Sequence, residues 1–171
     1  VVVKGLRRVG KTRLLNEALS KYAKNFLIIF IPKDETVSGF TEFLTTDMNI
    51  PRFPNLYELF KYLFEKYDYL FLDEFQNFYY MDKSAYSYIQ KLFDEYRMRN
   101  KTFCLLISGS SYSLMKKIFS DYAKALYGRK DFEILLEELD LRTVFLILED
   151  LGINGIEDKI KFWCVFGGIP K

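Results

Sequence analysis

The residues with the clearest chemical meaning form the run GLRRVGKT, Gly5 to Thr12. This run fits the pattern G-x-x-x-x-G-K-[ST] at every fixed position, with an apolar segment before it and a segment of helical period after it. Gly5 and Gly10 let the backbone curl so that successive N–H groups point at a phosphate. We therefore predict a phosphate-binding loop in which Lys11 reaches the β- and γ-phosphates of a nucleotide and Thr12 ligates Mg²⁺.

The predicted nucleotide contacts extend from this loop into the helix that starts near Lys11, whose positive N-terminal end favours the same anion. Arg7 and Arg8 occupy variable positions of the motif, and we expect their side chains to face solvent or a partner rather than the phosphates. The residues predicted to bind the nucleotide are Gly5, Arg8, Val9, Gly10, Lys11, Thr12 and Arg13.

A carboxylate pair follows another apolar run, in YLFLDEF. A phosphate-binding loop requires an acidic side chain at the end of a second buried strand, where it holds the metal from the other side. Asp73 is the predicted Mg²⁺ ligand, directly or through water, and Glu74 is the candidate general base. Gln76, in the turn that follows, either positions water or is an ordinary turn residue.

A third apolar run, LLISGSS, ends in small polar residues. In P-loop ATPases with a strand inserted between the two nucleotide-binding strands, a polar side chain here lies between the catalytic carboxylate and the γ-phosphate. Ser108 or Ser110 fits this role, with Ser110 placed among the catalytic candidates, although Ser-Gly-Ser-Ser also fits a loop with a helix N-cap.

Arg129 follows a predicted C-cap glycine, Gly128. An arginine at this point can stabilise transition-state charge, in cis or toward a neighbouring subunit. A solvated surface arginine is an equally good interpretation.

Composition narrows the class of protein. The 171 residues suffice for one domain with a sizeable core, and a net charge of +2 does not indicate nucleic acid or an anionic membrane as a bulk partner. Cys104 and Cys164 lie in apolar contexts with no histidine in the chain, so we interpret them as buried thiols of a reducing compartment. Without an apolar run of membrane-spanning length, a soluble, cytoplasmic protein is expected.

Short apolar runs alternate with segments of helical period, a pattern typical of an α/β fold. Expected strands cover 1–3, 26–31, 69–73, 103–108 and 132–136, in a parallel five-stranded sheet with helices on both faces. A short helix is expected near 38–47. Residues 1–141 would form the core and 142–171 the start of a truncated helical lid, in a fragment of a longer protein.

The chain contains 17 Phe and 13 Tyr, which raises the question of stacking on nucleic acid bases. The run FYYMDKSAYSYIQ at 78–90 is the densest in aromatic residues. Most of these residues lie on faces expected to be buried, so core packing is the favoured interpretation.

Taken in order, the motifs resemble the predominantly archaeal ATPase family of AAA-like P-loop proteins. The resemblance rests on GLRRVGKTRLL, YLFLDEFQNF, LLISGSSYSLMKK, YGRK and FGGIPK, and it spans nearly the whole chain. It implies a three-layer P-loop fold with the strand order 5-1-4-3-2, ATP and Mg²⁺ as ligands, and the roles given above for Lys11, Thr12, Asp73 and Glu74.

The leading hypothesis is an ATP-binding, Mg²⁺-dependent ATPase core that acts as a switch or motor for attached domains. The alternative is a scaffold that binds ATP, hydrolyses it negligibly and assembles with protein or DNA. A GTPase is disfavoured because NKTF at 100–103 lacks the aspartate of N-K-x-D. A protein partner or self-association would act through further domains, and a nucleic-acid partner is compatible but not indicated by this segment.

Overall fold

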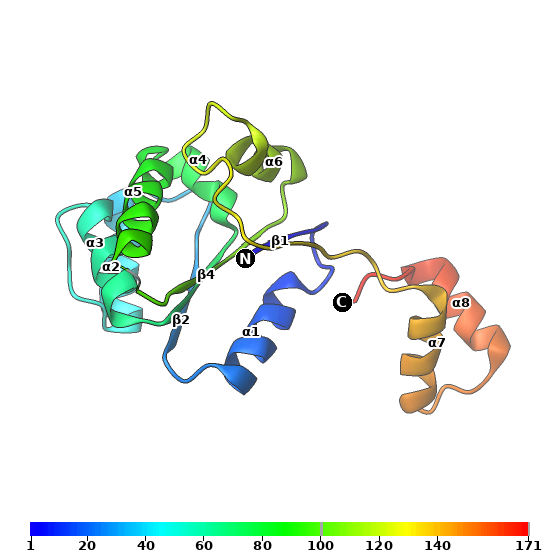
Figure 1. Ribbon diagram of the computed structural model, residues 1–171. Helices are drawn as coiled ribbons and strands as arrows, with labels where there is room; N and C mark the ends of the chain where they lie inside the picture. The colour runs from blue at the N-terminus through cyan, green and yellow to red at the C-terminus, as the bar shows by residue number, and fades with distance from the viewer. Residues whose placement is uncertain (100, 171) are drawn as a thin grey trace.

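Five parallel strands form the centre of the protein in the computed structural model, which describes residues 1–99 and 101–170 (Figure 1). The strands are β1 (Val2–Lys4), β2 (Phe26–Phe30), β3 (Tyr69–Asp73), β4 (Cys104–Gly109) and β5 (Glu133–Leu135). Their order is β2-β3-β4-β1-β5, which confirms the predicted order 5-1-4-3-2 read from the opposite edge. In this order β1 and β3 flank β4, so the loops that follow all three strands lie at one edge of the sheet.

The sheet is buried on both faces in its middle strands, as their continuous apolar runs predict. Alternate residues point to opposite sides, so Val3, Phe71 and Leu106 pack against α1 (Lys11–Tyr22) through Leu15 and Leu19. Strand β5 is the exception, because all three of its residues are exposed. It is an edge strand held to β1.

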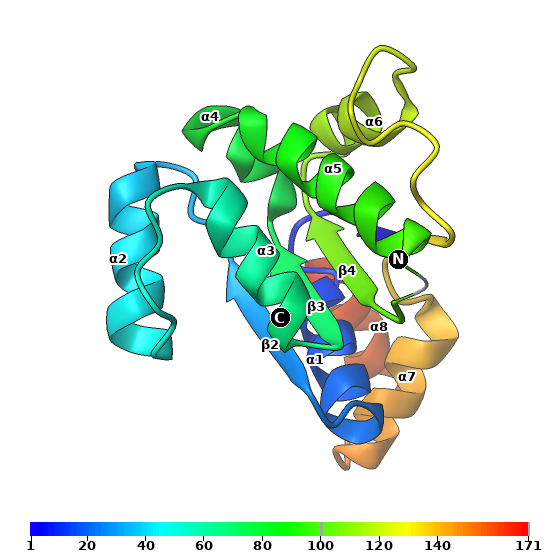
Figure 2. The same cartoon turned by 60° about the vertical axis from the view of Figure 1, so that its left-hand side comes forward.

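The other face of the sheet carries the larger core. It is covered by α2 (Val37–Met48), α3 (Leu56–Lys66), α5 (Ser84–Met98) and α6 (Tyr112–Ser120) (Figures 1 and 2). Between β3 and α5 the chain adds a 3₁₀ turn (Phe75–Asn77) and the short helix α4 (Phe78–Met81), which the sequence pattern did not predict. The helix expected near 38–47 is present and slightly longer, with the Thr36 hydroxyl accepting a hydrogen bond from the Gly39 amide at its start.

Aromatic residues fill this core only in part. Phe78 is fully buried and makes edge-to-face contacts with Phe40, Phe60 and Phe75. Tyr80, two residues later, is 55% exposed, so core packing is the wrong interpretation for this residue of the 78–90 run. The reason is that α4 is only one turn long and buries a single side.

The last part of the chain forms two helices, α7 (Leu141–Asp150) and α8 (Ile156–Phe166), which pack on each other (Figure 1). After α8 the chain returns to the core, where the Leu139 amide donates a hydrogen bond of 2.8 Å to the Gly168 carbonyl oxygen. The predicted division into a core of residues 1–141 and a lid of 142–171 stays a prediction. Among the described residues, no helix combines the length and the apolar character that crossing a membrane requires.

Candidate functional site

The loop between β1 and α1 adopts the strained conformation that its glycines predict. Gly10 has φ 95° and Arg8 φ 70°, both in the left-handed region. A Cβ at Gly5 would lie 2.3 Å from the carbonyl oxygen of Leu136, so a side chain cannot be accommodated without moving the backbone. Gly5 is therefore required by a close approach of two backbone segments, and Gly10 by the turn into α1.

Lys11 is the first residue of α1 and is buried, with 5% of its surface exposed. Its Nζ donates hydrogen bonds to the carbonyl oxygens of Gly5 at 3.0 Å and Leu6 at 2.7 Å. Burial lowers the pKa of Lys11, and the negative charges of Glu74 and Asp73 act in the opposite direction. The ammonium group thus lies inside the loop, within the field of the predicted metal ligand Asp73 and the candidate base Glu74.

Asp73 ends β3 and connects the predicted Mg²⁺ ligands. Its Oδ2 accepts a hydrogen bond of 2.6 Å from the Thr12 hydroxyl, and its Oδ1 accepts from the Ser108 hydroxyl and, at 3.0 Å, from the Glu74 amide. A carboxylate and a hydroxyl in direct contact, at the mouth of a phosphate-binding loop, form the hard oxygen donor set that suits Mg²⁺ together with nucleotide phosphates. These two residues fit the metal that the family implies.

Glu74 follows with φ 54°, an uncommon conformation for a residue with a side chain. Its Oε2 accepts hydrogen bonds from the Ser110 hydroxyl at 2.7 Å and from the Gln76 side-chain amide. The sequence left Ser108 and Ser110 as alternatives, and the structure gives each serine its own carboxylate. Ser108 binds Asp73, and Ser110 binds Glu74.

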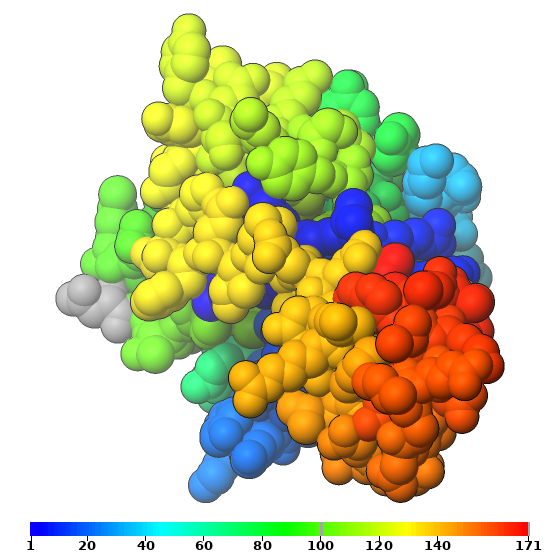
Figure 3. All heavy atoms as spheres, turned by 90° about the vertical axis from the view of Figure 1, so that its right-hand side faces the viewer, coloured from blue at the N-terminus to red at the C-terminus, as the bar shows by residue number. Residues whose placement is uncertain are grey.

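Lys11, Thr12 and Glu74 line a cavity of about 810 Å³. Seven residues that the sequence predicted to act at the site line it, namely Arg8, Val9, Gly10, Lys11, Thr12, Arg13 and Glu74. Sequence reasoning missed other wall residues, among them Leu136 and Pro170. Pro170 lies 3.9 Å from the position of a Cβ at Gly10, and Figure 3 shows the red C-terminal segment against the blue N-terminal residues. The sequence signal for this part of the wall was the pair Gly167-Gly168 before Pro170.

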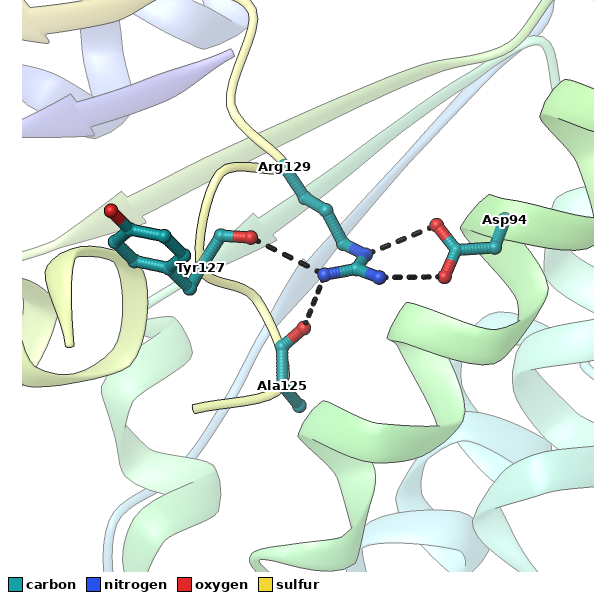
Figure 4. A network of polar contacts seen from close by, with 4 residues as sticks. All are labelled: Asp94, Ala125, Tyr127 and Arg129. Atoms are coloured by element: carbon teal, nitrogen blue, oxygen red, sulfur yellow. Dashed lines mark hydrogen bonds and ion pairs between the residues drawn. The ribbon is translucent and has the colours of Figure 1, made fainter. Parts of the chain in front are cut away.

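Arg129 does not line this cavity. Its Nε and Nη2 bind both carboxylate oxygens of Asp94, at 3.0 and 2.8 Å, and its Nη1 binds the carbonyl oxygens of Ala125 and Tyr127 (Figure 4). The bond to Asp94 raises the pKa of the guanidinium group. In this structure Arg129 forms a bidentate ion pair that ties the segment after α6 to α5. A catalytic role of Arg129, in cis or toward a neighbouring subunit, stays a prediction.

The comparison with protein families shows to which family the chain belongs. Residues 1–143 match the AAA domain. The chain belongs to this family. The predicted resemblance to AAA-like P-loop ATPases is thereby confirmed, and membership implies that this AAA domain binds nucleotide. No curated protein matches the chain.

Solved structures show the same fold. The Walker-type ATPase of Pyrococcus abyssi matches with a TM-score of 0.68 and 20% identity, over 99% of this chain and 59% of that one. Cdc6p from Pyrobaculum aerophilum matches with a TM-score of 0.62 and 19% identity, over 88% of this chain and 42% of that one. The ORC2 protein of Aeropyrum pernix, solved in ADPNP and ADP complexes, gives 0.59 and 16%, over 86% of this chain and 44% of that one. The AAA domain described here thus spans less than two thirds of each of these structures.

Proposed function

We propose that this AAA domain binds ATP with Mg²⁺ and hydrolyses it to ADP and phosphate, serving as a switch or motor for attached domains. The observation that carries the proposal is the pair of hydrogen-bonded contacts at the strand ends. The phosphate loop with Thr12 and the base candidate Glu74 line one cavity, and Asp73 and Ser110 are hydrogen-bonded to Thr12 and Glu74 behind this wall.

Each residue has a defined task in this proposal. Loop amides and Lys11 hold the β- and γ-phosphates, while Thr12 and Asp73 hold Mg²⁺, which neutralises phosphate charge when bound. Glu74 takes a proton from the attacking water, which leaves the water oxygen free to form the new bond to phosphorus as the bond to the ADP oxygen breaks. The role of Ser110 is to fix the direction in which the Glu74 carboxylate points.

A comparison of wild type with Glu74→Gln tests hydrolysis. Gln is isosteric but cannot accept the proton, so ATP turnover should fall by about a hundredfold or more. ATP-dependent thermal stabilisation should persist in this variant. Equal turnover by the two proteins would exclude Glu74 as the base.

Lys11→Ala tests the phosphate contacts separately. Removing the ammonium group should abolish stabilisation of the protein by ATP, because binding to the folded state alone raises the melting temperature. Unchanged stabilisation would exclude the assigned phosphate loop, whatever the result for Glu74.

A nucleotide-gated scaffold with negligible hydrolysis is the second candidate, and one observation favours it. The Glu74 carboxylate is bound by both Gln76 and Ser110, which restrains a group that must reach water. Under this alternative ATP stabilises the wild-type protein, while neither wild type nor Glu74→Gln releases phosphate. Both proposals include assembly with protein, with nucleic acid or with a second copy of the chain, through domains beyond this one. Both also include a cytoplasmic location.

A further inference from the structure

A second hollow lies away from the nucleotide cavity, where α4, the start of α5 and α6 meet (Figures 1 and 2). It has a volume of about 230 Å³ and includes the segment that follows α6. Three lysines line it, Lys83, Lys117 and Lys124, and no carboxylate is among the described residues of its wall. We call this hollow the lysine groove.

Tyrosine rings lie among these lysines. The Tyr79 ring has Lys83 Nζ at 4.2 Å and Lys117 Nζ at 5.5 Å from its centroid. The neighbouring Tyr80 ring, 5.5 Å from that of Tyr79, has Lys33 Nζ at 5.3 Å. Three lysine ammonium groups therefore lie within 5.5 Å of two adjacent tyrosine rings.

These tyrosines are not needed to fill the core. Phe78 performs that task on the buried side of α4, whereas Tyr80 is 55% exposed and Tyr79 half-buried at the groove. Tyr86, on the groove wall, has a structural role instead, because its hydroxyl donates to the Gln76 carbonyl oxygen at 3.2 Å. Tyr79 and Tyr80 thus lie outside the core, and the ring contacts given above are with lysines and with each other.

The lysines are likewise free of acidic partners. Within residues 1–99 and 101–170, ion pairs involve other lysines, such as Lys4, Lys130 and Lys159, but none of Lys33, Lys83, Lys117 and Lys124. Unpaired cations gathered at one place give a positive local field although the whole chain carries a net charge of only +2.

We propose that the lysine groove binds single-stranded nucleic acid. Lysines would contact successive phosphates, and the Tyr79 and Tyr80 rings would stack with unpaired bases. Duplex DNA offers phosphates but keeps its bases stacked inside, and an acidic peptide would pair with the lysines while leaving the rings unused. A single strand is the polymer that uses both features of the surface.

Binding of a fluorescein-labelled oligothymidylate, measured by anisotropy over a range of salt concentrations, tests the proposal. The combined variant Lys83→Gln/Lys117→Gln/Lys124→Gln should weaken binding at low salt and reduce the slope of log K against log salt by about 0.7 for each phosphate that a lysine no longer neutralises. Tyr79→Leu should weaken binding about tenfold, while Tyr79→Phe retains it, because the ring face rather than the hydroxyl stacks.

A matched control is Lys66→Gln. Lys66 also lies over tyrosine rings, those of Tyr62 and Tyr67, but at the end of α3 and outside the groove. This variant should bind the oligonucleotide like wild type. Thermal melting of every variant shows whether its fold persists, and Tyr80→Leu, at a ring that is 55% exposed, tests stacking where Tyr79→Leu lowers stability.

Three results would overturn the proposal. They are no binding by wild type, equal weakening in Lys66→Gln and the triple variant, and tighter groove-dependent binding of a poly-glutamate peptide or of duplex DNA than of the single strand. The measurement contains no ATP, so its outcome is independent of the ATPase proposal.

Discussion

At the scale of single residues, the two serines at the end of β4 show what the sequence could and could not predict. The run LLISGSS indicated a polar contact to a carboxylate, but it did not show which serine made it. The structure resolves this, since Ser108, inside β4, is fully buried against Asp73, and Ser110 lies beyond the strand end beside Glu74. We therefore predict that the two positions affect different steps.

Ser110→Ala should lower the turnover number for ATP by about tenfold to a hundredfold, because Glu74 loses the hydrogen bond that orients it. ATP-dependent thermal stabilisation should be unchanged. Steady-state phosphate release against ATP concentration measures this, and a rise in KM without a fall in turnover would contradict it.

Ser108→Ala should act on the metal instead. Asp73 would lose the hydrogen bond to its Oδ1, which fixes the orientation of the carboxylate whose Oδ2 contacts Thr12, and removing a support of this kind weakens metal affinity by about tenfold to a hundredfold. Turnover at saturating Mg²⁺ should recover, which a Mg²⁺ titration of the ATPase rate would show. An unchanged Mg²⁺ requirement would contradict the assignment of Asp73 as the supported ligand.

Arg129 marks the limit of reasoning from single residues. Its position after Gly128 suggested a catalytic arginine, but its carboxylate partner, Asp94, lies 35 residues earlier on a different helix. Nothing in the local sequence indicates that pairing. Motifs whose function is local, such as the phosphate loop, were predictable, whereas contacts set by packing between helices were not.

At the scale of elements, apolar runs predicted all five strands. For the middle strands the reason is that strands buried on both faces are nearly continuous in hydrophobicity, whereas β5 has an apolar run although its three residues are exposed. The strand order came from the family resemblance rather than from these runs. The short helix α4 and the 3₁₀ turn before it escaped prediction, since one turn of helix is too short to show a period. The sequence also did not predict that the segment after α8 returns to the nucleotide cavity, because this return depends on tertiary contacts.

Gly168→Ala should disturb that return. A Cβ at this position would lie 1.9 Å from the Leu139 carbonyl oxygen, so the segment carrying Pro170 must move away from the cavity. Stability should fall by about 1–3 kcal/mol, and stabilisation by ATP should shrink. Gly155→Ala is the control, because its nearest contact is the flexible Asp158 side chain at 3.2 Å. Equal melting curves for the two variants would contradict the prediction.

The start of α7 should respond to acid. Hydrogen bonds from the side chain and backbone of Thr143 lower the pKa of Asp140 below its ordinary value of 3.8. The cap is therefore fully effective above about pH 4 and is lost as the pH falls through the lowered pKa. The amide shift of Thr143 should report this transition, and Asp140→Asn, which caps without titrating, should remove it. A transition that persists in Asp140→Asn would assign it to another group.

At the scale of the whole molecule, the lysine groove and the nucleotide cavity lie on different parts of the surface, and one short turn is hydrogen-bonded to a residue of each. The 3₁₀ turn Phe75–Asn77 carries Gln76, whose side chain binds Glu74 and whose carbonyl oxygen accepts from Tyr86 on the groove wall. Helix α6, which also lines the groove, packs on the same turn. A ligand in the groove is thus linked to the candidate base through two contacts.

Single-stranded nucleic acid should therefore change the rate of ATP hydrolysis, and Tyr86→Phe should reduce that change. The substitution removes one hydrogen bond and keeps the ring, so ATP binding and oligonucleotide binding should each remain as in wild type. Both affinities and the ATPase rate, measured with and without oligothymidylate, complete the test. If the oligonucleotide changes the ATPase rate of Tyr86→Phe as much as that of wild type, the connection runs through α6 instead. If a bound oligonucleotide leaves the ATPase rate of wild type unchanged, the two sites work independently.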